Sequence, residues 1–414
     1  MRKKTSGSPV IFSRVRTTLL LLSALACGES STDVIKLSIT IEPQGGLIVG
    51  VGSTIDFLAA VRDESGQLVS GQNVIWSVEN TAIATIDQNG LATGVATGTT
   101  TVVASVGEVS RSVLLEVYVR EAISIYEVGK SYFGRNNYVE FIRGELPVVI
   151  SAPHGGALKP GETADRTYGT TVSDRNTVEL SLAVRDALID ATGYAPHLVL
   201  SHLHRTKLDP NREIVEAAQG DPFAENAWNE FQDWIKEARI FVAEDFEKGL
   251  YFDMHGHGHS IPRVELGYLL SSSDLSQNNS ALNSMTMVEK TSIRDLGRSA
   301  PETFSQLLRG PKSFGGFLGD EGVRSVPSPS DPSPGSDPYW TGGYNTREHG
   351  SRGMSEVISG IQLEHQYPGL RDTDANRQVY AVQLASAIRL FMLEHYGFFA
   401  VSYTHLTLPT NREV

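Results

Sequence analysis

The chain has 414 residues, of which 40% are hydrophobic, 8% aromatic and 20% charged. This composition is typical of a globular protein and excludes a wholly disordered, collagen-like or multispan membrane protein. Domains of roughly 100–200 residues predict two domains for this length. The formal net charge is −13, and no basic run is dense enough to neutralise many phosphates, so nucleic acid is not expected as a partner.

The first 26 residues have the pattern of an export signal. Five basic and no acidic side chains accompany the ten-residue apolar stretch 17–26, and Cys27 follows. This stretch is too short to span a membrane, which needs about 20 residues. The pattern resembles a bacterial lipoprotein signal, which implies that Cys27 is lipidated and becomes the new N-terminus. A secreted protein cut near Ala26 is the alternative. Either way we expect an exported protein without disulfides. In the lipoprotein case its only membrane contact is the lipid anchor at Cys27.

The segment 34–119 has the pattern of a small β domain. Short alternating runs rich in Val, Ile and Thr are separated by Gly, Asn and Asp turns, which predicts an antiparallel β-sandwich of about 85 residues. The runs VGSTIDFLAAVRDESGQLV, VIWSVEN and AIATIDQNGLATGVATGTTTVVAS also resemble the bacterial Ig-like domain of group 2. That resemblance implies a spacer or adhesive module that contacts cell-surface material. We expect Trp76 to be a core aromatic.

The segment 124–400 changes character. Apolar runs typical of buried strands alternate with helical patterns. We expect helices at 177–191, 222–248 and 374–396, and strands at 146–152, 197–201, 249–254, 265–270 and 360–364. This alternation predicts an α/β domain with a mostly parallel sheet flanked by helices, and a site beyond the carboxyl ends of the strands.

Two further segments interrupt this pattern. The stretch 326–343 is too rich in Pro, Ser and Gly for regular structure, so we expect a long loop that could serve as a lid. The last residues, 401–414, continue no earlier pattern and resemble translated sequencing-adapter read-through. We interpret them as a non-native tail and assign them no role.

Histidines follow two of the predicted strands. His154 lies in SAPHGG and His255 in DMHGHGH, where the glycines predict that a loop begins by His257. Two histidines and one carboxylate, with a fourth position open to water, suit a catalytic zinc ion. Asp174 is the preferred acid, although a charge at the start of a helix explains it equally well, and Glu162 is the alternative. Hydrogen-bonded turn histidines would explain His154 and His255 without a metal.

Cationic and acidic side chains follow other strands. Arg205, Asn211 and Arg212 form a plausible clamp for a substrate carboxylate, because a guanidinium holds a carboxylate through two parallel hydrogen bonds. We add His257 and Arg352 to the expected substrate-binding residues. Solvated loop charge is the simpler explanation of this group. Glu364 ends the strand-like GIQLE; it is either a surface acid or the general base and acid of a metallohydrolase.

These motifs carry a family resemblance. SAPHGG, the Asp174-Arg-Asn-Thr segment, HRTKLDPNRE, DMHGHGH and GIQLEHQ, in that order across about 146–396, resemble the N-formylglutamate amidohydrolase family. DPNR also resembles the Asp-x-Asn-Arg of zinc carboxypeptidases. Both resemblances imply a zinc-peptidase-like α/β fold with a single zinc ion. They imply that zinc is held by two histidines and an acid, that Arg205 polarises the scissile carbonyl, and that Glu364 activates water. They also imply that the substrate carboxylate is bound by Asn211 and Arg212.

The sequence therefore predicts an exported zinc amidohydrolase that cleaves an amide next to a carboxylate. An acyl-amino acid, a γ-glutamyl bond and a C-terminal peptide bond all meet that description. The alternative is a non-catalytic adhesion or glycan-binding protein of the cell surface.

Overall fold

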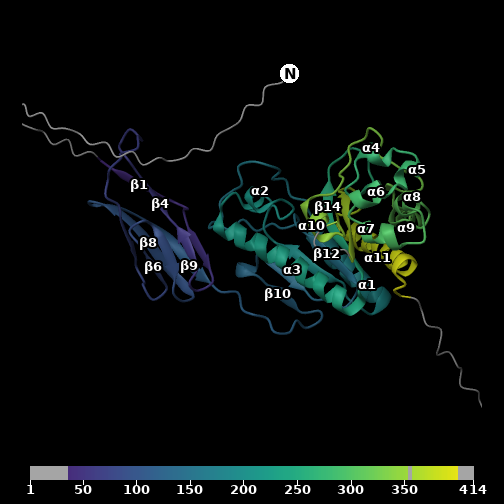
Figure 1. Cartoon of the computed structure of the whole chain (residues 1–414), viewed down its shortest axis with the longest axis horizontal. Coiled ribbons are helices and arrows are strands. Elements are labelled where there is room, and N and C mark those ends of the chain that lie inside the picture. Colours follow the sequence, from purple (N-terminus) through teal and green to yellow (C-terminus); the bar gives the residue numbers. More distant parts are fainter. Residues whose placement is uncertain (1–35, 353–356, 400–414) are drawn as a thin grey trace, which may run out of the picture.

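The computed structural model describes residues 36–352 and 357–399. The export signal, Cys27 and the segment 401–414 lie outside the described residues. Within them, every helix is too short or too polar to cross a membrane. Two bodies are evident: a small β domain near the N-terminus and a larger α/β domain (Figure 1).

In the part of the first body that the structure describes, nine short strands form three small sheets in the orders β2-β9-β8-β5, β3-β7-β6 and β1-β4. Trp76 is 6% exposed and packs 6.3 Å from the ring of Phe57 in the core, as expected. All the pairs are antiparallel except β2 with β9, which run parallel at one edge. The strands are β1 (Ser38–Glu42), β2 (Gly46–Val49), β3 (Thr54–Asp56), β4 (Leu58–Arg62), β5 (Ile75–Val78), β6 (Ala84–Ile86), β7 (Leu91–Gly94), β8 (Gly98–Val106) and β9 (Val109–Tyr118).

The second body contains an eight-stranded sheet in the order β10-β11-β13-β12-β14-β17-β15-β16. Its four central strands β13, β12, β14 and β17 run parallel, as do β15 and β16. The pairs β10–β11, β11–β13 and β15–β17 are antiparallel. The strands are β10 (Ser131–Phe133), β11 (Val139–Ile142), β12 (Val148–Ala152), β13 (His197–Ser201), β14 (Gly249–His257), β15 (Val264–Gly267), β16 (Ser325–Val326) and β17 (Ile358–Gln366).

The sheet is therefore mixed, with four parallel and three antiparallel pairs, and the expectation of a mostly parallel sheet is not confirmed. The expected strand at 265–270 is β15, and it lies antiparallel against β17. Only the short loop 258–263 joins β14 to β15, and a parallel crossover needs a dozen or more residues. Chain reversal at the edge follows from that short connection.

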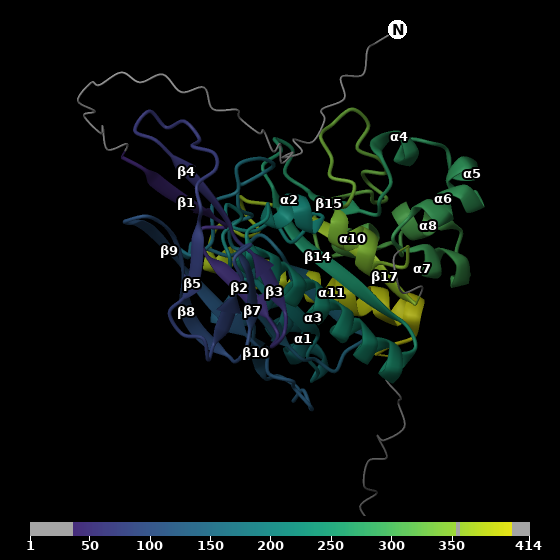
Figure 2. The ribbon, with the colours of Figure 1, turned by 60° about the vertical axis from the view of Figure 1, so that its left-hand side comes forward.

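Helices cover both faces of the sheet. Alternate strand residues face α1 (Thr177–Thr192) and α11 (Asp374–Tyr396) on one side and α3 (Pro222–Phe246) on the other, so that two apolar cores form. These three helices match the expected ranges within two residues. The short helices α4 to α9 gather at the end of the domain remote from the β domain (Figure 1), and Figure 2 shows α4 to α8 on that same side. The remaining helices are η1 (Arg135–Asn137), α2 (Ile214–Ala218), α4 (Ser272–Leu275), α5 (Asn279–Leu282), α6 (Met285–Lys290), α7 (Arg294–Ser299), α8 (Phe304–Arg309), α9 (Phe314–Asp320) and α10 (Tyr344–His349).

The two domains touch through a set of ion pairs. Arg135 in η1 donates to Glu116 of β9 at 2.9 Å and to Glu162 at 2.6 Å and 2.8 Å. The hydroxyl of Tyr118 in β9 donates to Glu230 of α3 at 3.3 Å. These contacts tie the end of the last strand of the β domain to the surface of the α/β domain.

Candidate metal centre

Three buried side chains converge at the carboxyl ends of the central strands. The Nδ1 atoms of His154 and His255 lie 3.1 Å apart, and Oδ2 of Asp174 lies 3.2 Å from the first and 3.1 Å from the second. A tetrahedral zinc site with bonds of about 2.0–2.1 Å has ligand–ligand edges of about 3.3 Å. The three atoms therefore stand close to the separations that a shared ion requires, and their side chains are at most 8% exposed.

The local backbone explains this convergence. His154 follows β12 and His255 lies within β14, and these two strands are parallel neighbours. Asp174 lies in the loop before α1. Its backbone N–H donates to the carbonyl of His154 at 3.0 Å, which holds the loop beside the two histidines. The N–H of Gly256 donates to Oδ2 of Asp174 at 3.2 Å. β14 continues to His257. The strand is therefore longer than the expected range 249–254, and it includes His257, where the glycines predicted a loop.

A second layer of carboxylates orients both histidines. Nε2 of His154 donates to Asp209 at 2.6 Å and Nε2 of His255 donates to Asp253 at 2.8 Å. With the Nε2 proton held in this way, each ring turns the lone pair of Nδ1 toward the shared centre, the arrangement that carboxylate–histidine–metal sites use. Sequence reasoning missed both aspartates. A signal for Asp253 was available, since it stands two residues before His255 on the same strand face.

The charges favour a cation at this point. Burial opposes protonation of His255, but Asp253 and Asp174 outweigh it and raise the pKa of His255 well above its usual value. Burial alone would raise the pKa of Asp209, yet His154 and Arg205 hold it well below the usual range. Burial would raise the pKa of Asp174 as well, but His154 and His255 lower it. Asp174 and Asp209 therefore stay ionised and stabilise positive charge beside them.

Glu364 stands beside the triad. It lies on β17 directly opposite His255 in the register of β14 and β17, and it is 5% exposed. Nε2 of Gln362 donates to its Oε1 at 2.9 Å. Burial raises the pKa of the Glu364 carboxyl to about 8, which suits a group that takes and returns a proton near neutral pH.

The expected carboxylate clamp is partly built into this network. Nε of Arg205 donates to Asp209 at 3.0 Å, and its Nη1 lies 3.5 Å from Oδ1 of Asp174. Nδ2 of Asn211 lies 3.2 Å from Nε2 of His255. Arg212 is more open: Nε donates to Glu216 at 3.2 Å, and 31% of its side chain is exposed.

A cavity of about 510 Å³ opens over these groups. It is lined by eight of the nine residues that the sequence predicted for the site: His154, Asp174, Arg205, Asn211, Arg212, His255, His257 and Glu364. The ninth, Arg352, is exposed in the turn after α10 and does not line the cavity. Exposed arginines are ordinary on a solvated loop, and the sequence held no signal to separate this one from the others.

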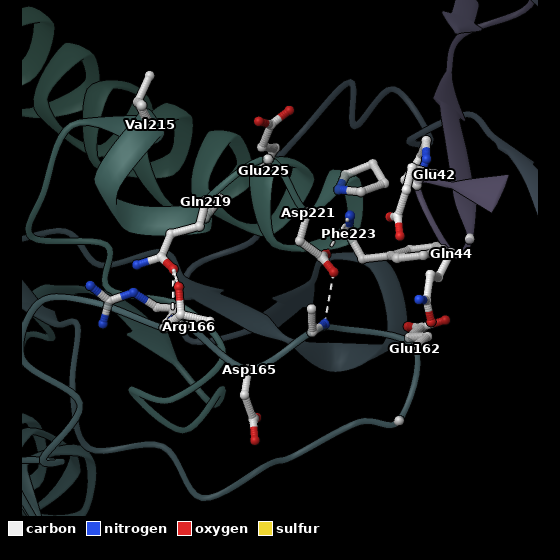
Figure 3. A pocket seen from close by; sticks show the side chains of 18 of the residues that line it. Glu42, Gln44, Glu162, Asp165, Arg166, Val215, Gln219, Asp221, Phe223 and Glu225 are labelled. Carbon is white, nitrogen blue, oxygen red and sulfur yellow. Dashed lines mark hydrogen bonds between the residues drawn. The ribbon is translucent and has the colours of Figure 1, made fainter. Parts of the chain in front are cut away.

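Glu162, the alternative acid, lies elsewhere. It accepts from Arg135 and Tyr138 and lines a second pocket, between the two domains, together with Glu42 and Asp221 (Figure 3). Arg135 lowers the pKa of Glu162 to about 2. Asp174 is therefore the acid that meets the two histidines.

Arg371 ties the three segments of the site together. Its buried guanidinium donates to the carbonyls of Arg175, His257 and His365, the last two at 3.4 Å and 3.2 Å. It lies against Gly256, where a Cβ atom would come within 2.3 Å of Cζ of the arginine. The glycine in DMHGHGH is thus needed for this close approach. Sequence reasoning missed Arg371, because no local pattern marks it.

His257 has both ring nitrogens in use. Nε2 donates to the carbonyl of Arg263 at 2.8 Å, and Nδ1 accepts from the N–H of His259 at 3.1 Å. Burial lowers the pKa of His257, so the ring is neutral. His257, His259 and Glu265 form a second group of side chains that could hold a metal ion. The hydrogen bonds that His257 already makes through both nitrogens would compete with such an ion.

Comparison with known proteins covers the two domains separately. Residues 37–117 match the family model for the bacterial Ig-like domain (group 2), whereas a search of curated protein sequences finds no match. Domains 4 and 5 of the S-layer protein SbsC share 23% identity over 20% of this chain and 52% of that one, with a TM-score of 0.19. This chain thus spans about half of that structure.

Two solved structures are similar to the larger part of the chain. An N-formylglutamate amidohydrolase from Ralstonia eutropha JMP134 shares 12% identity over 61% of this chain and 95% of that one, with a TM-score of 0.37. A gene product of Agrobacterium tumefaciens shares 14% identity over 61% and 93%, with a TM-score of 0.34. The family match at residues 37–117, and not these two structures, confirms the Ig-like domain expected at 34–119.

Proposed function

We propose that the α/β domain is a zinc-dependent amidohydrolase that cleaves an amide bond next to a carboxylate. An acyl-amino acid, a γ-glutamyl bond or a C-terminal peptide bond would be its substrate. One observation carries the proposal: the ligand atoms of His154, Asp174 and His255 lie within 3.2 Å of one another at the foot of a cavity. Glu364 and Arg205 line the same cavity.

The donor set suits zinc. Two imidazole nitrogens and one carboxylate oxygen, with the fourth direction open to a cavity, are a common set for catalytic zinc. Both histidines have the carboxylate partners that metal-bound histidines usually have. When bound, zinc supplies a water of lowered pKa and polarises the substrate carbonyl.

The residues around the triad have separate tasks. Glu364 takes a proton from the attacking water and later returns it to the leaving amine, because its carboxyl is buried beside the triad and has a raised pKa. Arg205 donates a hydrogen bond to the oxyanion that develops at the carbonyl carbon. Arg212 is the more open cation of the cavity, and it holds the substrate carboxylate with help from Asn211.

Turnover by a single pair of variants tests this function. Wild type, Glu364→Gln and the control Glu225→Gln are loaded with zinc and offered a panel of N-acyl amino acids. Glu225 lines the pocket between the domains and not the cavity. We expect Glu364→Gln to lose kcat by about 10²–10⁴-fold with unchanged zinc content, and Glu225→Gln to match wild type. Equal rates in all three, or no amide turnover by wild type, would favour the adhesion or glycan-binding alternative.

We further propose that the protein is exported and held at the cell envelope by a lipid on Cys27, with the Ig-like domain facing cell-surface material. The family match at residues 37–117 supports a surface role, and the pattern of residues 1–27 supports the anchor. Membrane fractionation of wild type and Cys27→Ala separates the anchored from the secreted form. Wild type should require detergent for release, and Cys27→Ala should not.

A further inference from the structure

One side of the cavity has no task in the proposed hydrolysis. The ring of Trp340 lies at the rim, 5.7 Å from the ring of His259 with 14° between the two planes, a stacked pair. Trp340 nevertheless remains 49% exposed. A large aromatic side chain held half open inside a cavity offers an apolar face to a ligand.

A buried carboxylate holds this stacked pair in place. Glu265 is fully buried on β15. Its Oε1 lies 2.8 Å from Nδ1 of His259, and its Oε2 accepts a hydrogen bond from the backbone N–H of Trp340 at 2.8 Å. The residues on either side of the tryptophan are fixed as well, since the hydroxyl of Tyr339 donates to the carbonyl of Leu266. The carbonyl of Thr341 accepts from Leu269.

This anchoring changes the interpretation of the loop 326–343. The segment lacks helix and strand after Val326, as expected, and residues 339–341 are hydrogen-bonded to β15 and to Leu269 next to the cavity. Arg263 adds ion pairs to Asp331 at 3.1 Å and to Asp337 at 3.4 Å. The tryptophan face is therefore set in advance, so a ligand does not have to order it.

The sheet register shows where this face lies. His255 of β14 is opposite Glu364 of β17, and Glu364 is opposite Glu265 of β15. Neighbouring residues in register point to the same face of a sheet. One row across the sheet therefore holds the metal ligand His255, the proposed base Glu364 and Glu265, which binds Trp340. Arg205 and Arg212 follow β13, on the other side of β12 and β14. Strands are about 4.8 Å apart, so cationic and aromatic ends of the cavity flank the triad.

We infer that the Trp340 face is the subsite for the acyl group and that the preferred substrates are amino acids with a flat aromatic N-acyl group. This inference rests on the proposed function for the orientation of the substrate. The carboxylate lies toward Arg212, the amide lies over the triad, and the acyl ring stacks on Trp340. A formyl or acetyl group is too short to cover the indole, whereas a benzoyl ring presents a matching face.

Binding to a protein that cannot turn its ligand over tests the subsite. Zinc-loaded Glu364→Gln is titrated calorimetrically with N-benzoylglycine and with N-acetylglycine, alone and combined with Trp340→Ala, Trp340→Phe or Tyr194→Ala. Tyr194 is the matched control, since it is 53% exposed and lies before the amino end of β13, away from the cavity. Zinc content and melting temperature show that each variant is folded and loaded.

We expect N-benzoylglycine to bind about tenfold more tightly than N-acetylglycine, as stacking contributes about that factor. Trp340→Ala should abolish this preference and leave the affinity for N-acetylglycine within about twofold of that of Glu364→Gln alone. Trp340→Phe and Tyr194→Ala should keep the preference for N-benzoylglycine. Equal affinities for the two ligands, no binding of N-benzoylglycine, or equal weakening of both by Trp340→Ala would overturn the subsite. If the preference depends on Trp340 but wild type hydrolyses no amide, then the hydrolase proposal fails while the subsite stands.

Discussion

Replacing Asp209 with asparagine removes one charge from behind the metal centre and keeps the shape of the side chain. In the native protein Oδ1 of Asp209 accepts Nε2–H of His154 at 2.6 Å, and Oδ2 accepts Nε–H of Arg205 at 3.0 Å. Asparagine has a single carbonyl oxygen, so one of these two donors would face the amide NH₂ instead. Because the Asp209 side chain is fully buried, water cannot replace the lost acceptor.

The size of the effect follows from the role of such carboxylates. Loss of an outer-shell partner costs 10- to 100-fold in metal affinity, about 1.4–2.7 kcal/mol. We expect Asp209→Asn to lie near the upper limit, because both of its oxygens serve the site. Competition with a chromophoric chelator at fixed pH measures the zinc affinity. The control is Asp165→Asn, which removes a carboxylate that is 70% exposed and paired with Lys207. A folded Asp209→Asn that binds zinc within twofold of the wild-type affinity would show that Asp209 does not orient the metal ligands.

Three further predictions test other parts of the account. Arg371→Ala should weaken zinc binding by about tenfold and guanidinium ion should restore it, whereas unchanged affinity on chelator competition would assign Arg371 no positioning role. In the metal-free protein the raised pKa of His255 stabilises the fold below about pH 6.5, and this contribution is lost as the pH rises through the folded pKa. Since zinc needs the neutral ring, the rise in melting temperature that zinc confers should grow between about pH 6 and about pH 8; a rise that shrinks with pH would contradict the assignment of His255. Arg135→Met should lower the free energy of unfolding by about 1–3 kcal/mol in urea titrations, because it strands Glu116 and Glu162, both partly exposed, and zinc content should not change. Loss of zinc in that variant would bring Glu162 back as a ligand.

The sequence could predict the site residues that lie at the carboxyl ends of strands. The rule that functional side chains follow the carboxyl ends of parallel strands placed His154 and His255 together, because β12 and β14 pair directly. The same rule placed Glu364 on the next strand of the sheet. The two histidine assignments depend on local pattern alone, an apolar run and then a histidine beside glycine, whereas Glu364 only ends an apolar run.

Long-range packing decided the rest. The sequence favoured Asp174 over Glu162 without deciding between them, and the structure separates them because Arg135 binds Glu162 at the domain junction. Asp209 and Arg371 orient the site through hydrogen bonds to residues 55 or more positions away in the sequence, such as His154 and His257, and no short window reveals such pairs. The antiparallel direction of β15 was missed for a different, local reason: the loop 258–263 before it is too short for a parallel crossover.

Three side chains from distant parts of the chain meet at one point, and we propose that a single ion binds between them. Crystals grown with zinc and measured on both sides of the zinc absorption edge would show this ion. We predict an anomalous peak at about 2.0–2.2 Å from Nδ1 of His154, Nδ1 of His255 and a carboxylate oxygen of Asp174. Absence of a peak there at full zinc loading, or a peak only at His257, His259 and Glu265, would contradict it.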